Sequence, residues 1–315
     1  MTGTLQPSNA SVTISGLSHS ASALTGFNLV GNPFACNATI TDAQGAAMPF
    51  YVISGRNVVA YEGSEPIAPG TGVMMQADAN HESVTFTKVT PEAQASQSNN
   101  GSLQIALAQA NTRSSARIDN AIVSFNEGNE LEKFYFGTQN ANIYLPQNGK
   151  DYAIAFSDRA GAVPLNFKAT ENGKYTISVN PEGVEMNYLH LIDNMTGVDV
   201  DLLATNGGDA KHGDAMPCVS TYTFEAKTTD YESRFRLMFV PVSEDAGGDN
   251  EAFAFYSNGN WFIANEGRAT LQVIDVTGRI LSSETISGSF SKAIDVAPGV
   301  YILKLNDKAQ KIVIR

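Results

Sequence analysis

The segment KYTISV (Lys174–Val179) alternates polar and apolar side chains, with Tyr175, Ile177 and Val179 at every second position. Because neighbouring side chains of a β-strand point to opposite faces, this period of two predicts a strand with one buried and one solvated face. Similar short segments recur on both sides of it, bounded by Gly, Pro, Asn and Ser. The sequence therefore predicts an all-β protein.

The segments around Lys174–Val179 are spaced closely enough to predict a two-sheet, jelly-roll-like sandwich over residues 103–243. The other strands expected in this region are Leu103–Leu107, Ala121–Phe125, Asp151–Phe156, Leu165–Ala169, Tyr188–Asp193, Tyr222–Ala226 and Phe235–Val240.

Two polar stretches with few side chains to bury, at residues 91–102 and 243–250, divide the chain. They predict an N-terminal β-module over 1–95, the central sandwich over 103–243 and a C-terminal immunoglobulin-like sandwich over 251–315. In the first module, Tyr51–Ile53 and Asn57–Tyr61 predict a hairpin. The expected fold class is thus a series of tandem β-sandwich modules.

The composition restricts the classes of function that are open to this chain. The net charge of −12 and the pI near 4.7 exclude a protein that binds the nucleic-acid backbone, which requires a clustered excess of Lys and Arg. The N-terminus has neither the basic start nor the apolar run of a secretory signal, and no stretch is apolar enough to span a bilayer. If the protein is secreted, we expect the chain to be a mature or truncated form, or the C-terminal portion of a longer protein.

Few residues suggest catalysis or metal binding. His81 and Glu82 begin like a zincin motif, but Thr85 stands where the second His is needed. Neither the Gly-x-Ser-x-Gly elbow nor a phosphate-binding Gly-rich loop occurs, and we expect no enzyme, although two suitably spaced carboxylates would suffice for a glycosidase. Cys36 and Cys218 are expected to be small buried or half-buried side chains.

Acidic turn residues keep a calcium site open as one interpretation. Asp193, Asp199 and Asp201 flank the turn at 194–197 and carry the oxygen ligands that calcium prefers, although their spacing matches no known calcium loop and solvated turn residues are the simpler interpretation. The same two interpretations apply to the loop with Asp209, His212 and Asp214. Trp261, beside Phe262, fits a core position better than a platform for stacking a sugar.

The end of the chain carries the most specific motifs: DVTGR (Asp275–Arg279), APGVYILK (Ala297–Lys304) and QKIVIR (Gln310–Arg315). Together and in this order they resemble the C-terminal sorting domain of type IX secretion (Por) cargo from the Bacteroidota. Residues 291–315 also hold five Lys or Arg and two Asp, a basic island in an acidic protein.

The resemblance implies a role for each matching residue. Asp275, Gly278 and Arg279 match its turn motif, and Gly299 would permit the turn into the penultimate strand. Tyr301 would pack beneath that turn. Lys304 and Lys311 would present positive charge to the export machinery of the outer membrane. For these lysines, protection of an edge strand against aggregation is the structural alternative.

Upstream, GFNLVGNPF (Gly26–Phe34) resembles the GWNLVGNPF element of β-modules that precede such domains in large surface proteins, with Phe27 in place of Trp. The resemblance implies a non-catalytic stalk and sorting region of a secreted or outer-membrane, cell-surface protein. The alternative is an adhesin-like or glycan-binding surface protein that uses loops of the first two domains to hold a glycan or protein ligand. We expect no cofactor in either case, with calcium as the one ion left open.

The domain boundaries lead to a first prediction. Limited proteolysis should cut first near Ser96–Gly101 and near Asp245–Asp249, because segments with few side chains to bury give a protease access to the backbone. Mass spectrometry of the early fragments measures the cut positions. Rapid cleavage within residues 165–240 while both stretches stay intact would contradict the three-domain division.

Overall fold

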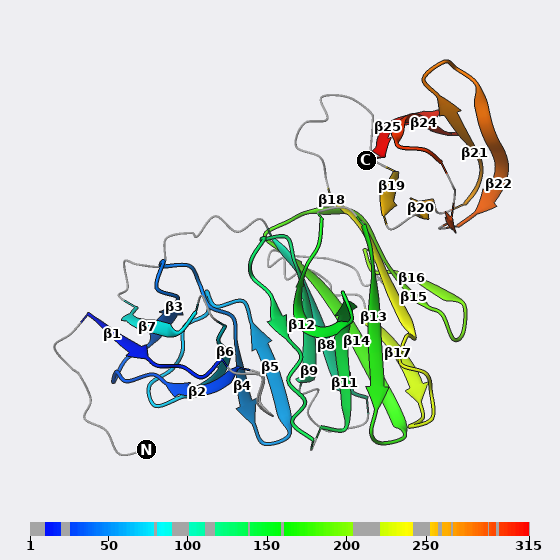
Figure 1. The fold of residues 1–315 in the computed structure, drawn as a ribbon. Coiled ribbons are helices and arrows are strands. Elements are labelled where there is room, and N and C mark those ends of the chain that lie inside the picture. Colours follow the sequence, from blue (N-terminus) through cyan, green and yellow to red (C-terminus); the bar gives the residue numbers. More distant parts are fainter. Residues whose placement is uncertain are drawn as a thin grey trace, which may run out of the picture. The chain divides into compact units, whose positions relative to one another are not determined.

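The structure is a computed structural model. It describes residues 10–19, 26–78, 81–89, 101–110, 117–137, 139–158, 161–203, 221–241, 253–257, 260–265, 267–288, 290–293 and 296–314. In this part the protein is all-β, and its strands form several sheets in sandwich-like arrangements (Figure 1). The predicted fold class of tandem β-sandwich modules is confirmed. None of the described residues belongs to a helix long and apolar enough to cross a bilayer.

Contacts divide the chain into two compact units. The first comprises Met1–Phe156, Leu165–Gly183 and Thr221–Glu232, and the second comprises Ser157–Pro164, Val184–Ser220 and Ser233–Arg315. The expected boundaries at 91–102 and 243–250 fall almost wholly outside the described residues. The three-domain division therefore stays a prediction.

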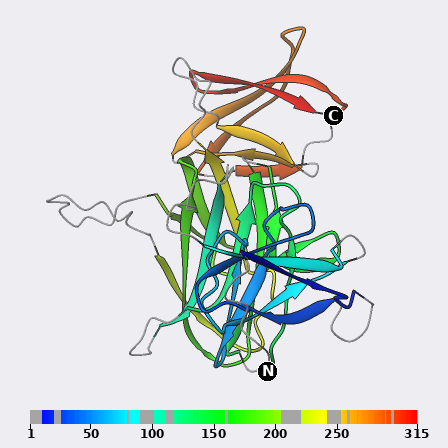
Figure 2. The same ribbon diagram turned by 90° about the vertical axis from the view of Figure 1, so that its left-hand side faces the viewer.

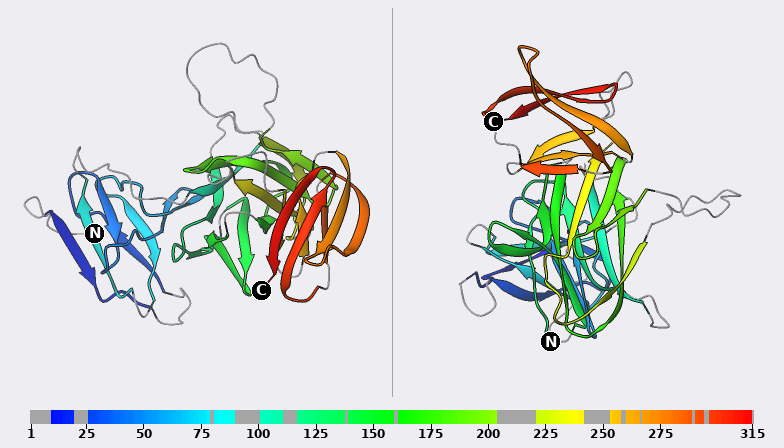
Figure 3. Two further views of the ribbon diagram at one scale, coloured as in Figure 1. Left: turned by 90° about the horizontal axis from the view of Figure 1, so that it is seen from above. Right: turned by 90° about the vertical axis from the view of Figure 1, so that its right-hand side faces the viewer.

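The N-terminal part of the first unit is a sandwich of two sheets, coloured blue to cyan in Figures 1 and 3. One sheet has the order β1-β7-β3 and the other β2-β6-β4-β5. Inward side chains from both sheets, such as Ile40, Phe50, Met75 and Phe86, share one core. The strands are β1 (Ser11–Ser15), β2 (Phe27–Gly31), β3 (Ala38–Thr41), β4 (Phe50–Ser54), β5 (Asn57–Tyr61), β6 (Gly72–Gln76) and β7 (Ser83–Lys88).

The predicted hairpin in this sandwich is confirmed: β4 and β5 pair antiparallel from Phe50 opposite Tyr61 to Ser54 opposite Asn57. Met74 and Met75 point to opposite faces of β6, as period two requires. Met75 is fully buried in the sandwich core, whereas Met74 packs, partly buried, against a different apolar cluster.

The remaining strands of the first unit follow the order β11-β12-β9-β8-β14-β17, with β10 against β12 and the second half of β13 against β11. The predicted strands in this region are confirmed. β9 and β12 pair in parallel, from Ile122 opposite Ile154 to Ser124 opposite Phe156, which the sequence did not indicate. The strands are β8 (Ser102–Gln109), β9 (Arg117–Ser124), β10 (Leu131–Glu132), β11 (Ala141–Gln147), β12 (Lys150–Phe156), β13 (Gly161–Ala169), β14 (Gly173–Glu182) and β17 (Thr221–Ala226).

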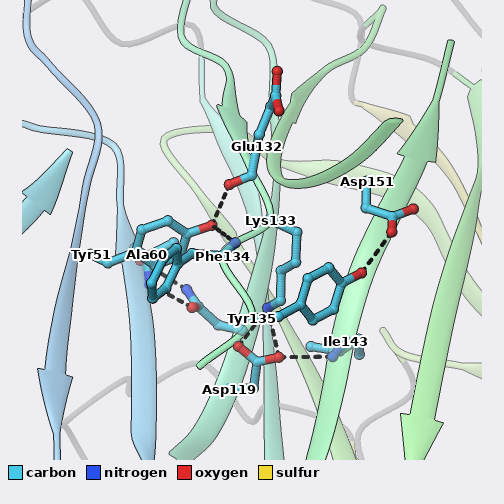
Figure 4. Close-up of polar contacts among 10 residues, drawn as sticks. Tyr51, Ala60, Asp119, Glu132, Lys133, Phe134, Tyr135, Ile143 and Asp151 are labelled. Atoms are coloured by element: carbon cyan, nitrogen blue, oxygen red, sulfur yellow. Dashed lines mark hydrogen bonds and ion pairs between the residues drawn. The ribbon is translucent and has the colours of Figure 1, made fainter. Parts of the chain in front are cut away.

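A buried ion pair lies among these strands (Figure 4). Lys133 Nζ lies 2.6 Å from both carboxylate oxygens of Asp119, and both side chains are fully buried. The backbone N–H of Ile143 donates to the same carboxylate at 2.8 Å. Burial raises the pKa of Asp119 and lowers the pKa of Lys133, while their mutual attraction opposes both shifts. Removing either partner would leave an uncompensated buried charge, which would strongly destabilise the fold.

Next to the ion pair, the N-terminal sandwich and the central strands share polar and apolar contacts within the first unit. The side-chain amide of Asn120 exchanges two hydrogen bonds with the backbone of Ala60, at 2.7 and 2.9 Å. Tyr51 Oη donates to the carbonyl of Glu132 and accepts from the backbone N–H of Phe134. The surrounding apolar cluster draws on both parts of the unit and includes Phe27, Val58, Ile122, Leu131 and Ile154.

The second unit contains β15 (Met186–Asp193), which pairs with β16 (Val198–Asp201) on one side and β18 (Phe235–Pro241) on the other. Asp193 and Arg234 form a buried ion pair here, with Arg234 Nη2 at 2.9 Å from Asp193 Oδ2. Phe262, from later in the same unit, packs with Tyr188 and Met238 in a small buried cluster.

Residues 253–314 form a terminal sandwich of two sheets, seen as separate layers in Figure 2. The sheets have the orders β19-β20-β23 and β22-β21-β24-β25. Their shared core includes Trp261, which is fully buried, so the prediction of a core role for Trp261 is confirmed. The strands are β19 (Ala254–Ser257), β20 (Asn260–Ile263), β21 (Arg268–Asp275), β22 (Ile280–Ser287), β23 (Phe290–Ala293), β24 (Gly299–Leu305) and β25 (Lys308–Ile314).

The expectation for the cysteines is wrong for Cys36, whose side chain is exposed. It lies in the bend between β2 and β3. There its backbone carbonyl accepts a hydrogen bond from Asn32 Nδ2 at 2.9 Å. Cys218 lies outside the described residues.

The buried ion pair leads to a prediction about stability. Lys133→Met should lower the free energy of unfolding by about 3–5 kcal/mol, because it leaves the Asp119 carboxylate buried without a counter-charge. The double variant Lys133→Met/Asp119→Leu should lose much less, since no charge remains to be buried. Urea unfolding followed by far-ultraviolet circular dichroism measures both.

The matched control is Lys150→Met, which removes a solvent-exposed partner of Glu132 and should cost at most about 1 kcal/mol. A double variant that is as unstable as the Lys133→Met single variant would show that the ion pair is not the cause.

Candidate functional site

The DVTGR motif forms the turn between β21 and β22, and its residues bind one another. Asp275 Oδ1 accepts hydrogen bonds from the backbone N–H of Thr277 and of Arg279 at 2.9 and 3.0 Å, and from the Thr277 hydroxyl at 2.6 Å. Arg279 Nε donates to Asp275 Oδ2 at 3.0 Å. Gly278 has φ of 84°, a left-handed conformation in which glycine carries no steric penalty. The motif thus specifies a tight hairpin turn.

These hydrogen bonds stabilise the charged form of Asp275. The Thr277 hydroxyl contributes most, and together with the Arg279 and Thr277 backbone N–H groups and the Arg279 side chain it lowers the pKa of Asp275 from 3.8 to about 2. The carboxylate is therefore ionised at neutral pH and holds both ends of the turn.

Tyr301 belongs to the core below the first residues of β24. Its hydroxyl donates to the carbonyl of Ala297 at 2.7 Å, and its ring meets Trp261 edge-on with centroids 6.1 Å apart. The side chain is buried and packs with residues of both sheets. Tyr301 therefore anchors residues 297–299, which lead into β24, to the core of the terminal sandwich.

Gly299 does not need the conformational freedom of glycine. Its backbone lies outside the left-handed region, and a Cβ built there would meet the Tyr301 ring at 3.6 Å, an ordinary van der Waals distance. The turn-permitting role that the resemblance implied for Gly299 has no steric basis in this geometry. Alanine would fit at this position, and a larger side chain would come against the Tyr301 ring.

Lys304 and Lys311 lie on the outer face of the terminal sheet. Both are exposed, on the adjacent strands β24 and β25, where Lys304 is opposite Ala309 and Lys311 is opposite Ile302. Inward positions between them, such as Leu303 and Ile312, are buried. The period of two thus explains why the two lysines share one face.

Apolar side chains accompany the lysines on this face, which the sequence analysis missed. Across the sheet, Ile280 pairs with Ile274, Ile274 with Ile302, and Ile302 with Lys311. Ile280 is 53% exposed, Ile302 40% and Val313, the neighbour of Val300, 54%. We call Ile274, Ile280, Ile302, Lys304, Lys311 and Val313 the outer face. Outward isoleucines at alternating strand positions were the signal that could have revealed it.

The acidic residues proposed for a cation are engaged by basic side chains. Asp193 is fully buried and paired with Arg234, and its Oδ1 also accepts from the backbone N–H of Met195. Asp199 Oδ1 lies 2.7 Å from His190 Nδ1, and Asp201 Oδ1 lies 3.8 Å from His190 Nε2. In the described ranges, no group of three His, Cys, Asp or Glu side chains is arranged to hold a metal ion. Asp209, His212 and Asp214 lie outside those ranges.

Comparisons with protein-family models, with curated proteins and with solved structures give no match for this chain.

The Asp275 turn leads to a prediction about pH. Because its folded-state pKa is depressed, Asp275 contributes stability that is present above its unfolded pKa and is lost as the pH falls from about 4 towards 2. Asp275→Asn should unfold at a lower temperature than the wild type at neutral pH, and the difference should shrink to a small part of that value as the pH falls to 2. The fluorescence of Trp261, the single tryptophan, reports on this sandwich specifically.

Asp307→Asn, in the exposed turn between β24 and β25, removes the same charge outside the motif and should not reproduce the effect. A difference between Asp275→Asn and wild type that stays constant down to pH 2 would contradict the assigned role of the carboxylate.

Proposed function

We propose that this chain is the non-catalytic stalk and sorting region of a secreted, cell-surface protein. In this proposal the terminal sandwich is a type IX export and anchoring signal, read by the export machinery of the outer membrane. The preceding β-modules space a passenger from the membrane. The resemblance of the motifs between Asp275 and Arg315 to sorting domains supports the assignment.

The outer face is the single observation that carries this proposal. It places two motif lysines, Lys304 and Lys311, beside exposed apolar side chains on one face of one sheet. Exposed apolar groups next to charges are typical of surfaces that bind another protein. Gatekeeper lysines alone would not require exposed Ile280, Ile302 and Val313 beside them.

Charge supports a specific kind of partner. The chain has a net charge of −12, but residues 291–315 have an excess of basic side chains. A basic island on an acidic chain orients the molecule, so that the terminal sandwich meets an acidic surface first. The proposed receptor therefore presents carboxylates around an apolar contact.

The motif residues divide into two groups in this proposal. Asp275, Gly278, Arg279 and Tyr301 hold the turn and the core, and they shape the surface without being recognised themselves. Lys304 and Lys311 are the groups that the receptor contacts. The signal is thus a folded surface rather than a linear peptide.

A secretion experiment tests this proposal. Residues 251–315 are fused behind a signal peptide and a reporter in a bacterium with type IX machinery, and reporter activity is measured on the cell surface and in the periplasm. The intact fusion should reach the surface. Deleting residues 299–315 should retain the reporter in the periplasm, and Lys304→Gln/Lys311→Gln should reduce surface delivery about tenfold while Trp261 fluorescence shows an intact fold.

Lys292→Gln is the control for position: it removes a charge of the same basic stretch, but from β23 in the other sheet, and should reduce delivery much less than the double lysine variant. Surface delivery of the truncated fusion would refute the proposal. Full delivery of the double lysine variant would refute the role of the outer face.

A further inference from the structure

The first unit contains a pocket that the proposed sorting function does not use. Its volume is about 400 Å³, within the range of small-molecule sites. It lies between the segment after β10, the strands β11 and β12, and the end of β13. The lining residues are Tyr135, Gly137, Gln139, Asn142, Asp151, Lys168, Thr170 and Glu232.

Gln139 makes this pocket unusual. Its side chain is only 4% exposed, yet neither its amide nitrogen nor its amide oxygen has a hydrogen-bond partner among the described residues. Asn142, 7% exposed, has an unpartnered Oδ1 in the same pocket. A buried polar group without a partner is costly, so such groups at a pocket wall indicate a ligand that supplies the missing bonds.

The backbone that carries Gln139 is held in place. The Thr170 hydroxyl donates to the Gln139 carbonyl at 2.5 Å, and the backbone N–H of Thr170 donates to the Asn140 carbonyl at 2.9 Å. Tyr175 Oη lies 3.0 Å from the same Asn140 carbonyl and shares its one proton between it and the Glu171 carbonyl at 2.7 Å. The backbone at Gln139 is therefore fixed in advance, and burial restricts the rotamers of its side chain, which reduces the entropy cost of binding.

Other lining residues offer an aromatic ring and charged groups. Tyr135 is half exposed, and its hydroxyl donates to Asp151 Oδ2 at 2.6 Å (Figure 4). Glu232 accepts hydrogen bonds from Lys168 Nζ and from the Tyr144 hydroxyl, and these bonds, the Lys168 bond most, lower the pKa of Glu232. Two carboxylates and one ammonium thus face the pocket, which disfavours an anionic ligand.

We propose that this pocket binds one neutral pyranose unit of a glycan. A sugar hydroxyl both donates and accepts, so neighbouring hydroxyls satisfy the Gln139 N–H groups together with the oxygens of Gln139 and Asn142. The exposed face of Tyr135 provides the apolar contact for the C–H groups of the ring. Asp151 and Glu232 accept from further hydroxyls at the rim.

The test uses the whole chain and, separately, free glucose, galactose, mannose and N-acetylglucosamine. Saturation-transfer NMR should show binding of at least one of these sugars. Gln139→Leu should weaken that binding about tenfold or more, because both amide bonds to the sugar are lost. The same variant should keep or raise the unfolding temperature, because it removes an unsatisfied buried amide.

Gln147→Leu is the matched control: it makes the same substitution in β11, outside the pocket lining, and should bind the sugar as the wild type does. Absence of binding for all four sugars would overturn the proposal, as would equal binding by wild type and Gln139→Leu. A marked drop in the unfolding temperature of Gln139→Leu would also overturn it, since the amide would then serve the fold. These readouts are independent of secretion, so either proposal can fail alone.

Discussion

The buried ion pair between Lys133 and Asp119 is the constraint on which the first unit depends. Because Lys133 points inward to Asp119, the neighbouring backbone is fixed where Tyr51 bonds both Glu132 and Phe134, and Tyr135 is left to face Asp151. The pair thereby holds the segment to which Tyr51 of the N-terminal sandwich is bonded and from which Tyr135 enters the pocket lining. A buried ion pair is destabilised strongly when one partner is removed, so its two residues act as one structural element.

The sequence predicted the strands whose side chains alternate, because the period of two persists wherever one face of a strand is solvated. It also predicted the apolar run Ala121–Phe125, whose residues are all buried. It missed β11, whose first five residues are all buried and whose Pro146 lies where the strand leaves β13 and pairs with β12. It also missed β16, because Asp199 and Asp201 made this strand read as a polar turn, whereas Asp199 contacts His190 of the neighbouring strand. The Lys133–Asp119 pair left no local signal, since its partners are 14 residues apart and both types are usually exposed.

The candidate site was partly predictable for the same reason. Motif order located the residues between Asp275 and Lys311, but it could not separate those that build the turn and core from those that face outward. Only strand register does so: it buries Tyr301, exposes Lys304 and Lys311, and brings Ile280, Ile274 and Ile302 into one row. The pocket around Gln139 was not predictable, because four separate segments of the chain supply its lining residues.

We propose that the outer face is recognised as a folded surface during export. The most direct test places a photoreactive amino acid at position 304 of the full chain, and for comparison at the exposed position 225, in cells with type IX machinery. Cross-linking followed by mass spectrometry should join position 304, and not position 225, to an outer-membrane component of that machinery. An absence of such an adduct at 304, or equal adducts from both positions, would contradict the account.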